Sequence, residues 1–142
     1  MEISQVRKRI QAAMTAARDR AKQRRQKADD AERAYEAFLE HRAGPLARQV
    51  VNALRAEGYS FTVSTPGRGL RVSLDQGRDD FIELGLNTDA DQPHVVGRIR
   101  RTRGSRTIDE ELPVGQGVAP QDVSEADVLE FLAGALEPWL ER

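Results

Sequence analysis

The first third of the chain carries mostly apolar residues at alternating intervals of four and three, which is the spacing of one helix face. Ile3 and Val6 extend the start of this stripe, whose regular part comprises Ile10, Met14, Ala17, Ala21, Arg24, Ala28, Ala31, Tyr35 and Phe38. Neither Gly nor Pro interrupts the segment before Gly44-Pro45. The pattern predicts a helix over roughly residues 2 to 43, with the heptad spacing of a weak coiled coil.

Like charges leave one alternative for this segment. Residues 18 to 27 hold six basic side chains against one acidic side chain, and their repulsion could break the helix into a hairpin. We favour the continuous helix, because no Gly, Pro or turn cluster marks a break. At 1.5 Å per residue it would reach about 60 Å, beyond a compact domain of roughly 35 Å. Only its last third, with Tyr35, Phe38 and Leu39, would then pack on that domain.

Beyond residue 43 the apolar pattern changes twice. Gly44-Pro45 predicts a helix stop followed by a new, short helix. The apolar face of this helix consists of Leu46, Val50, Val51 and Leu54. From Tyr59 the period becomes two, which predicts half-buried strands. The alternating stretches are 59–64, 70–74, 80–86, 94–102 and 106–112, and their short connections favour an antiparallel meander.

The C-terminal residues return to helical spacing. Ser124 is suited to cap this helix, with Asp127 near its positive end, and Pro138 is expected to end or kink it. The predicted buried stripe comprises Val128, Leu132, Leu136 and Leu140, with Leu129 and Phe131 beside them. The elements together predict an α+β fold: a long N-terminal helix, a short helix, an antiparallel meander of four or five strands, and a C-terminal helix packed on the sheet.

Composition agrees with a chain in two parts. Hydrophobic residues make up 39% and charged residues 32%, which suits a solvated element outside a core. We expect a long basic helix over residues 1–43, acting as a coiled-coil or docking element, and a compact α+β domain over residues 44–142. No apolar run approaches the ~20 residues that span a bilayer, and the chain begins without a secretion signal, so we expect a cytoplasmic protein.

Charge is distributed unevenly along the chain. Residues 1–28 hold nine Lys or Arg against two acidic residues, hence +7, while the whole chain sums to −1 and the remainder therefore to −8. This asymmetry predicts an anionic partner for the helix, either nucleic acid or an acidic protein surface, including one on the same protein. The residues that could bind nucleic acid are Arg18, Arg20, Lys22, Arg24, Arg25 and Lys27.

A second basic stretch, residues 97–111, holds five arginines followed by three carboxylates. Alternation places Arg98 and Arg100 on the outer face of a strand, and a turn near Gly104 brings the acidic residues back alongside them. Their expected neighbours are Glu83, Asp109 and Glu111. We expect cross-strand ion pairs here rather than phosphate contacts, because these carboxylates would repel a nucleic-acid backbone.

No motif in the sequence points to catalysis, a cofactor or a metal. His41 and His94 have no companion ligands, and Cys is absent. The fragment NTDAD, residues 87–91, lacks the Gly and Glu of a calcium loop, and the Gly-rich fragments lack the Lys of a phosphate loop. We therefore expect a protein that is not an enzyme and has no cofactor.

The exposed end of the helix suggests the function. Covering an apolar side chain contributes about 1.5 to 3 kcal/mol, which favours a partner helix over solvent. We expect a non-enzymatic protein-interaction or adaptor module that oligomerises or docks through this helix, with a nucleic-acid-binding dimer as the alternative. The expected contact residues are Ile3, Val6, Ile10, Met14 and Ala17.

Overall fold

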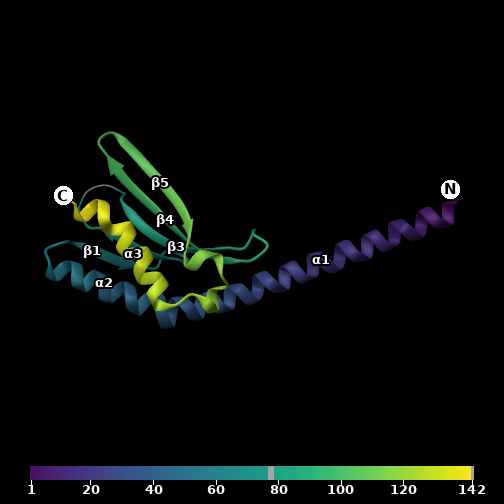
Figure 1. Cartoon of the computed structure of the whole chain (residues 1–142), viewed down its shortest axis with the longest axis horizontal. Helices are drawn as coiled ribbons and strands as arrows, with labels where there is room; N and C mark the ends of the chain where they lie inside the picture. Colours follow the sequence, from purple (N-terminus) through teal and green to yellow (C-terminus); the bar gives the residue numbers. More distant parts are fainter. Residues whose placement is uncertain (77–78, 142) are drawn as a thin grey trace. The chain divides into compact units, whose positions relative to one another are not determined.

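The chain forms two units in the computed structural model, which describes residues 1–76 and 79–141. The first unit is Met1–Asp30 and the second is Ala31–Arg142. Helix α1 (Ile3–Phe38) supplies nearly all of the first unit, and its last turns belong to the second together with every other element (Figure 1). The compact unit thus begins at Ala31, ahead of the boundary at residue 43 that Gly44-Pro45 suggested.

Helix α1 is continuous, so the alternative of a break within residues 18–27 is wrong. The predicted stop at Gly44 is also wrong, because a π-helical turn, Leu39–Ala43, joins α1 to α2 (Gly44–Ala56). Pro45 has no N–H, and its ring would clash with the carbonyl four residues earlier in a regular helix. The wider π turn accommodates it: the Gly44 N–H donates to the Leu39 carbonyl, five residues back.

The strands form a single antiparallel sheet in which they follow one another in chain order (Figure 1). They are β1 (Phe61–Ser64), β2 (Leu70–Leu74), β3 (Phe81–Asn87), β4 (His94–Arg103) and β5 (Arg106–Pro113). The predicted meander is therefore confirmed. Gly104 turns the chain between β4 and β5 with a φ of +63°, a left-handed conformation that glycine adopts readily.

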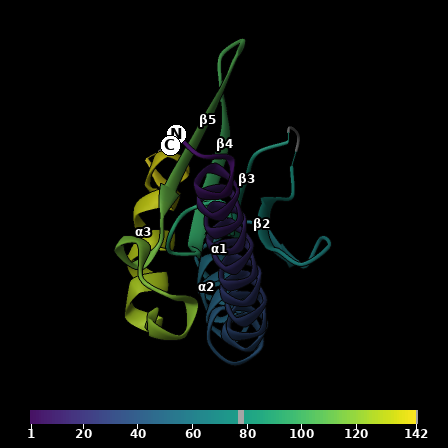
Figure 2. The same ribbon diagram turned by 90° about the vertical axis from the view of Figure 1, so that its right-hand side faces the viewer.

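Helices cover one face of this sheet. The buried side chains from α1, α2 and α3 (Glu125–Leu140) meet the inward strand positions in one core. The larger members are Tyr35, Phe38, Val51, Phe61, Val72, Ile82, Leu84, Val95, Ile99, Leu132, Leu136 and Trp139. Figure 2 shows helix α3 on the side of the sheet where β4 and β5 lie. A Cβ added at Gly97 would lie 2.1 Å from the Phe131 ring, so glycine permits this close packing.

Helix α3 begins as predicted, with Ser124 as its N-cap. The Ser124 hydroxyl accepts a hydrogen bond from the Asp127 N–H, and the Asp127 carboxylate accepts one from the Ser124 N–H. Pro138 does not end the helix, which continues to Leu140. Leu129 was expected beside the buried stripe but is 45% exposed, because no other element of the described chain covers that side of α3.

The fold is the α+β arrangement that the sequence predicts, with five strands and the C-terminal helix on the sheet. Within the described ranges, none of the helices has both the length and the apolar character needed to cross a bilayer.

Candidate interaction surface

The predicted contact residues form an uncovered apolar stripe on α1, which we call the N-terminal seam: Ile3, Val6, Ile10, Met14 and Ala17. Ile3 is 79% exposed, Ile10 54%, and both Val6 and Met14 46%. Side chains of this size are usually covered in a folded protein. Five of the eight large hydrophobic residues recorded as exposed lie between Met1 and Met14, so the apolar exposure of the described chain is concentrated here.

The same stripe is buried where it continues into the compact unit. Ala31, Tyr35 and Phe38 lie three and four residues apart, as the seam positions do, and their exposed fractions are 7%, 3% and 0%. Tyr35 donates a hydrogen bond from its hydroxyl to the Leu84 carbonyl on β3 at 3.2 Å. One helical pattern thus serves two purposes: its C-terminal part anchors α1 in the core, and its N-terminal part is left uncovered.

Between these two parts lies the basic segment, residues 18–27. Its six basic residues, Arg18, Arg20, Lys22, Arg24, Arg25 and Lys27, are all exposed. Within the segment, Arg20, Lys22, Arg24, Arg25 and Lys27 follow one another with no acidic residue between them. The unit Met1–Asp30 holds nine basic and four acidic residues, hence +5, and Ala31–Arg142 holds thirteen and nineteen, hence −6.

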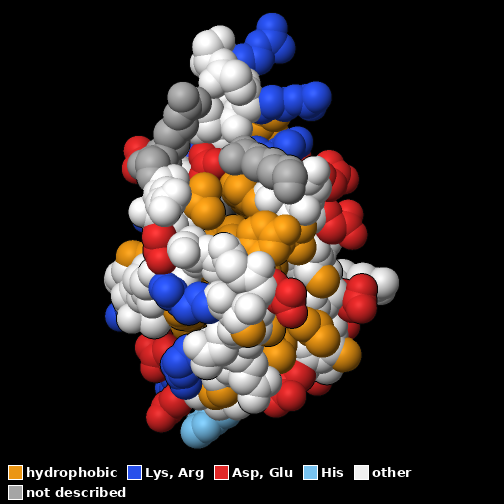
Figure 3. Space-filling view, turned by 90° about the vertical axis from the view of Figure 1, so that its left-hand side faces the viewer, with side chains coloured by type: hydrophobic (Ala, Val, Ile, Leu, Met, Phe, Trp, Pro, Cys, Tyr) orange, Lys and Arg blue, Asp and Glu red, His pale blue; other side chains and the backbone are white. Residues whose placement is uncertain are grey.

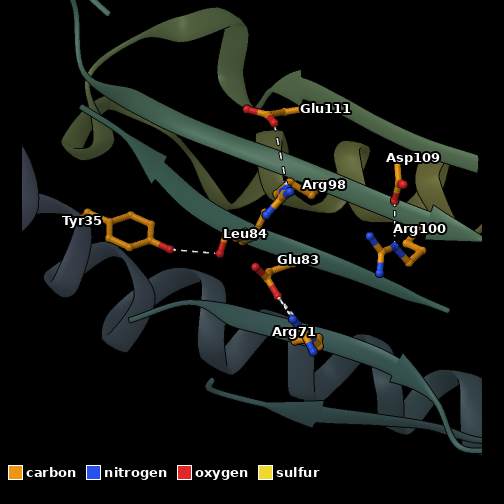
Figure 4. A network of polar contacts seen from close by, with 8 residues as sticks. All are labelled: Tyr35, Arg71, Glu83, Leu84, Arg98, Arg100, Asp109 and Glu111. Atoms are coloured by element: carbon orange, nitrogen blue, oxygen red, sulfur yellow. Dashed lines mark hydrogen bonds and ion pairs between the residues drawn. The ribbon is translucent and has the colours of Figure 1, made fainter. Parts of the chain in front are cut away.

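Arg98 and Arg100 of the second arginine stretch form ion pairs across the sheet, as predicted. The register pairs Arg98 with Glu83 on one side and with Glu111 on the other. Figure 4 shows the outer face of these strands, where the Arg98 side chain lies 3.9 Å from the Glu111 carboxylate. On this face Arg100 donates from Nε to Asp109 at 2.8 Å, and this hydrogen bond raises the pKa of Arg100.

The same face contains one further ion pair and an aromatic ring. Arg71 on β2 and Glu83 on β3 lie 2.5 Å apart (Figure 4). The guanidinium groups of Arg71 and Arg100 lie 4.2 and 5.5 Å from the centre of the Phe81 ring. Arginines paired with carboxylates and stacked on a ring stabilise the sheet, and they are poorly placed to bind a phosphate backbone.

Asp80 is a buried carboxylate of the compact unit, and sequence reasoning missed its role. One oxygen accepts from the Thr102 N–H and hydroxyl, both at 2.9 Å, and the other from the Trp139 indole at 3.1 Å. These donors satisfy the carboxylate and tie β4 and α3 to the start of β3. The side chain therefore has a structural role. No sequence motif marks it, because its partners lie far along the chain.

Other features of the described chain add no catalytic arrangement. A pocket of about 410 Å³ beside Trp139 is bordered by Arg101, Arg103 and Glu141, which bring opposite charges but no nucleophile with a base. His94 is held by a 2.8 Å contact with the Gln92 carbonyl. No three His, Cys, Asp or Glu residues of the described ranges gather closely enough to bind a metal ion.

Comparison with known proteins does not add a family. A scan against models of protein families, a search of curated proteins and a search of solved structures each find no match to this chain. The assignment of the candidate surface therefore depends on the exposure and charge of its own residues. Among the described residues after Met1, the most exposed large hydrophobic side chains lie on the N-terminal seam, which the sequence predicts, and on the side of α3 around Leu129, which it does not.

Proposed function

We propose that this chain is a non-enzymatic interaction module that associates with a protein surface through the N-terminal seam. The observation that carries the proposal is the change along one helical stripe, which is covered at Tyr35 and Phe38 and uncovered at Ile3, Ile10 and Met14. Covering each of the larger uncovered side chains contributes about 1.5 to 3 kcal/mol. Their sum is enough to drive association, and self-association is the simplest form of it.

The residues of the seam are suited to a helical partner. Ile3, Ile10 and Met14 supply apolar area near the start of α1, and Ala17 and Ala21 follow on the same stripe. Small residues let two helices approach closely, and large ones supply the contact area. The arrangement resembles half of a helix-helix interface.

A nucleic-acid-binding dimer is the second candidate, and the exposure of all six basic residues of the basic segment is the observation that favours it. A helix with such a stripe can contact phosphates along a groove. The −6 of the compact unit opposes the approach of a polyanion. We therefore place this candidate behind a protein partner.

The proposal predicts that Ile10→Glu with Met14→Glu abolishes self-association and leaves the sheet unit folded. Two carboxylates in the seam would have to lose their hydration on docking, which is costly. Light scattering after size exclusion, with the protein at tens of micromolar, would report the mass. Circular dichroism would report the fold.

Ala12→Glu with Thr15→Glu is the matched control, since it adds the same charge to α1 away from the stripe. This control should associate as the wild type does. A wild-type chain that is monomeric at these concentrations would reject self-association. Loss of the folded unit in the seam variant would show instead that the seam belongs to the core.

A further inference from the structure

Helix α3 has an uncovered side, which we call the acidic face: Ala126, Leu129, Glu130, Ala133, Gly134 and Glu137. All six residues are exposed, and Leu129 is 45% exposed. They recur at helical intervals of three and four, so they lie on one side of α3, away from the stripe of Val128, Leu132 and Leu136. The face thus combines an exposed Leu with small side chains and carboxylates.

The charge of α3 has one sign. From Glu125 to Glu141 the chain holds five acidic residues and neither Lys nor Arg. Figure 3 shows hydrophobic side chains in the middle of one side of the molecule with Asp and Glu side chains around them, while Lys and Arg lie at the upper end of that view and at its left. An apolar strip between carboxylates suits a basic partner with an apolar stripe of its own.

Gly134 adds an independent observation. Glycine within a helix is less stable than alanine, so its presence usually reflects close packing or a special backbone conformation. A Cβ at Gly134 would meet no atom within 4 Å, and the residue has no positive φ. Gly97 and Gly44, by contrast, each lie against an atom that a Cβ would strike. No residue that the structure describes requires glycine at this point of α3, whereas the close approach of a second helix would.

Charge disfavours the pairing of two α1 helices with each other. In a parallel coiled coil built on the observed spacing, Arg24 would face its own copy at a core position, and Arg20 would face Arg25 at the flank. An antiparallel pair centred on Ile10 would cover the seam but leave residues 20–27 beyond the overlap, so their basic side chains would gain no acidic neighbour from the second α1. The α1 helix is therefore better matched by the acidic face than by a second α1.

We infer that α1 of one molecule docks on the acidic face of α3 in a second copy of this chain. The 16 residues of α3 span about 24 Å, which matches the stretch of α1 from Ile10 to Arg25. In this arrangement the seam residues Ile10, Met14 and Ala17 meet Leu129 and its small neighbours, while basic side chains flank the carboxylates. The inference rests on the proposed function and names the partner of the same seam.

The charges of the whole chain favour this partner over an unrelated one. The +5 of Met1–Asp30 and the −6 of Ala31–Arg142 nearly cancel, so two copies attract through their opposite parts without a large net repulsion. If each α1 docks on the α3 of the other copy, the two equal contacts close a two-fold dimer. If the second contact does not form within the same pair of molecules, the chains assemble head to tail.

The test is a charge exchange in the full-length chain. One variant carries Arg18→Glu, Lys22→Glu and Arg25→Glu on α1, and a second carries Glu130→Arg and Glu137→Arg on α3. A third variant combines all five substitutions. We expect each single set to raise the dissociation constant by roughly tenfold or more, since like charges then meet, and the combined chain to recover most of the affinity. Sedimentation velocity across a dilution series measures the constants.

Glu57→Arg with Glu110→Arg is the control for the α3 set, because it changes the net charge equally at exposed positions elsewhere in the compact unit. It should associate as the wild type does.

Wild-type affinity in the α3 variant, or no recovery in the combined chain, would overturn the inference. Tighter association of the α1 variant would indicate pairing between α1 helices. In each of these outcomes the proposed function survives if the Ile10→Glu, Met14→Glu substitutions still abolish association. A monomeric wild type overturns this inference and rejects self-association, which leaves docking of the seam on a different protein.

Discussion

Tyr35 shows how one residue joins the N-terminal helix to the sheet. Its ring is 3% exposed and lies 6.2 Å from that of Phe38, while its hydroxyl donates to the Leu84 carbonyl. Burial raises the pKa of Tyr35 well above its usual value, and the negative charge of Glu83 raises it further. The side chain therefore stays protonated in the folded protein at a pH where the unfolded chain begins to ionise.

We predict that the free energy of unfolding falls as pH rises above about 10, and that Tyr35→Phe reduces this fall. The folded pKa is the higher one, so the contribution is complete below the unfolded pKa of 10.0 and is lost as pH rises toward the folded value. Near pH 7 the variant loses about 0.5 to 1.5 kcal/mol with its hydrogen bond. Urea titrations at several pH values measure both effects.

Tyr59→Phe is the control, because it removes the hydroxyl of the other tyrosine in the chain. The alkaline fall in stability should be smaller in Tyr35→Phe than in this control. If stability falls at alkaline pH in Tyr35→Phe as much as in the wild type, Tyr35 is not the cause of the fall.

At the scale of elements, the π turn Leu39–Ala43 decides how two helices are joined. A Cβ on Gly44 would lie 2.7 Å from the Leu39 carbonyl oxygen, a contact with backbone that no rotamer change removes. Gly44 therefore has a helical backbone but cannot become alanine without a shift of the turn. The Gly-Pro pair usually marks the end of a helix, but here it permits the π turn that joins two helices.

Gly44→Ala should destabilise the compact unit by about 1 to 2 kcal/mol, since the strain exceeds the better helix propensity of alanine. Gly134→Ala is the matched control and should stabilise by about 0.5 to 1 kcal/mol, because its Cβ meets nothing within 4 Å. Both are best measured by urea unfolding in the Ile10→Glu, Met14→Glu background, so that association does not contribute. Equal effects of the two substitutions would contradict the strain at Gly44.

At the scale of the whole molecule, opposite charge is divided between two units. The basic segment lies in Met1–Asp30, and most of the acidic residues lie in Ala31–Arg142. The outer-face arginines Arg98 and Arg100 are engaged by Glu111 and Asp109, so they add little to any anion site. The basic segment attracts an acidic partner, but the acidic compact unit repels an extended polyanion. This division of charge therefore favours a compact acidic protein surface over nucleic acid.

This division predicts weak binding to nucleic acid. Fluorescence anisotropy with duplex DNA and with single-stranded RNA should show no complex near physiological salt, and only weak binding at low salt. The six basic residues of the basic segment would need to contact several phosphates for tight binding, and affinity would then fall steeply as salt rises. A steep fall that Arg18→Glu, Lys22→Glu and Arg25→Glu abolish would favour the nucleic-acid dimer instead.

The sequence by itself determined the elements and much of their pairing. Helical spacing located α1 and α3, the period of two located all five strands, and alternation with a turn at Gly104 predicted that Arg98 and Arg100 face Asp109 and Glu111. These features depend on local geometry, since the side-chain period and the turn are set by neighbouring residues. The seam was predictable for the same reason.

Helix length already predicts that Phe38 is covered and that Ile10 is not, as the structure has it. Within the compact unit, tertiary structure alone decided which apolar positions are covered. Leu129 is exposed although its neighbour Val128 is buried, and Asp80 is satisfied by Thr102 and Trp139. A periodic pattern shows which face of an element is apolar, but burial depends on which distant elements pack against that face. That choice rests on contacts between residues far apart in the sequence.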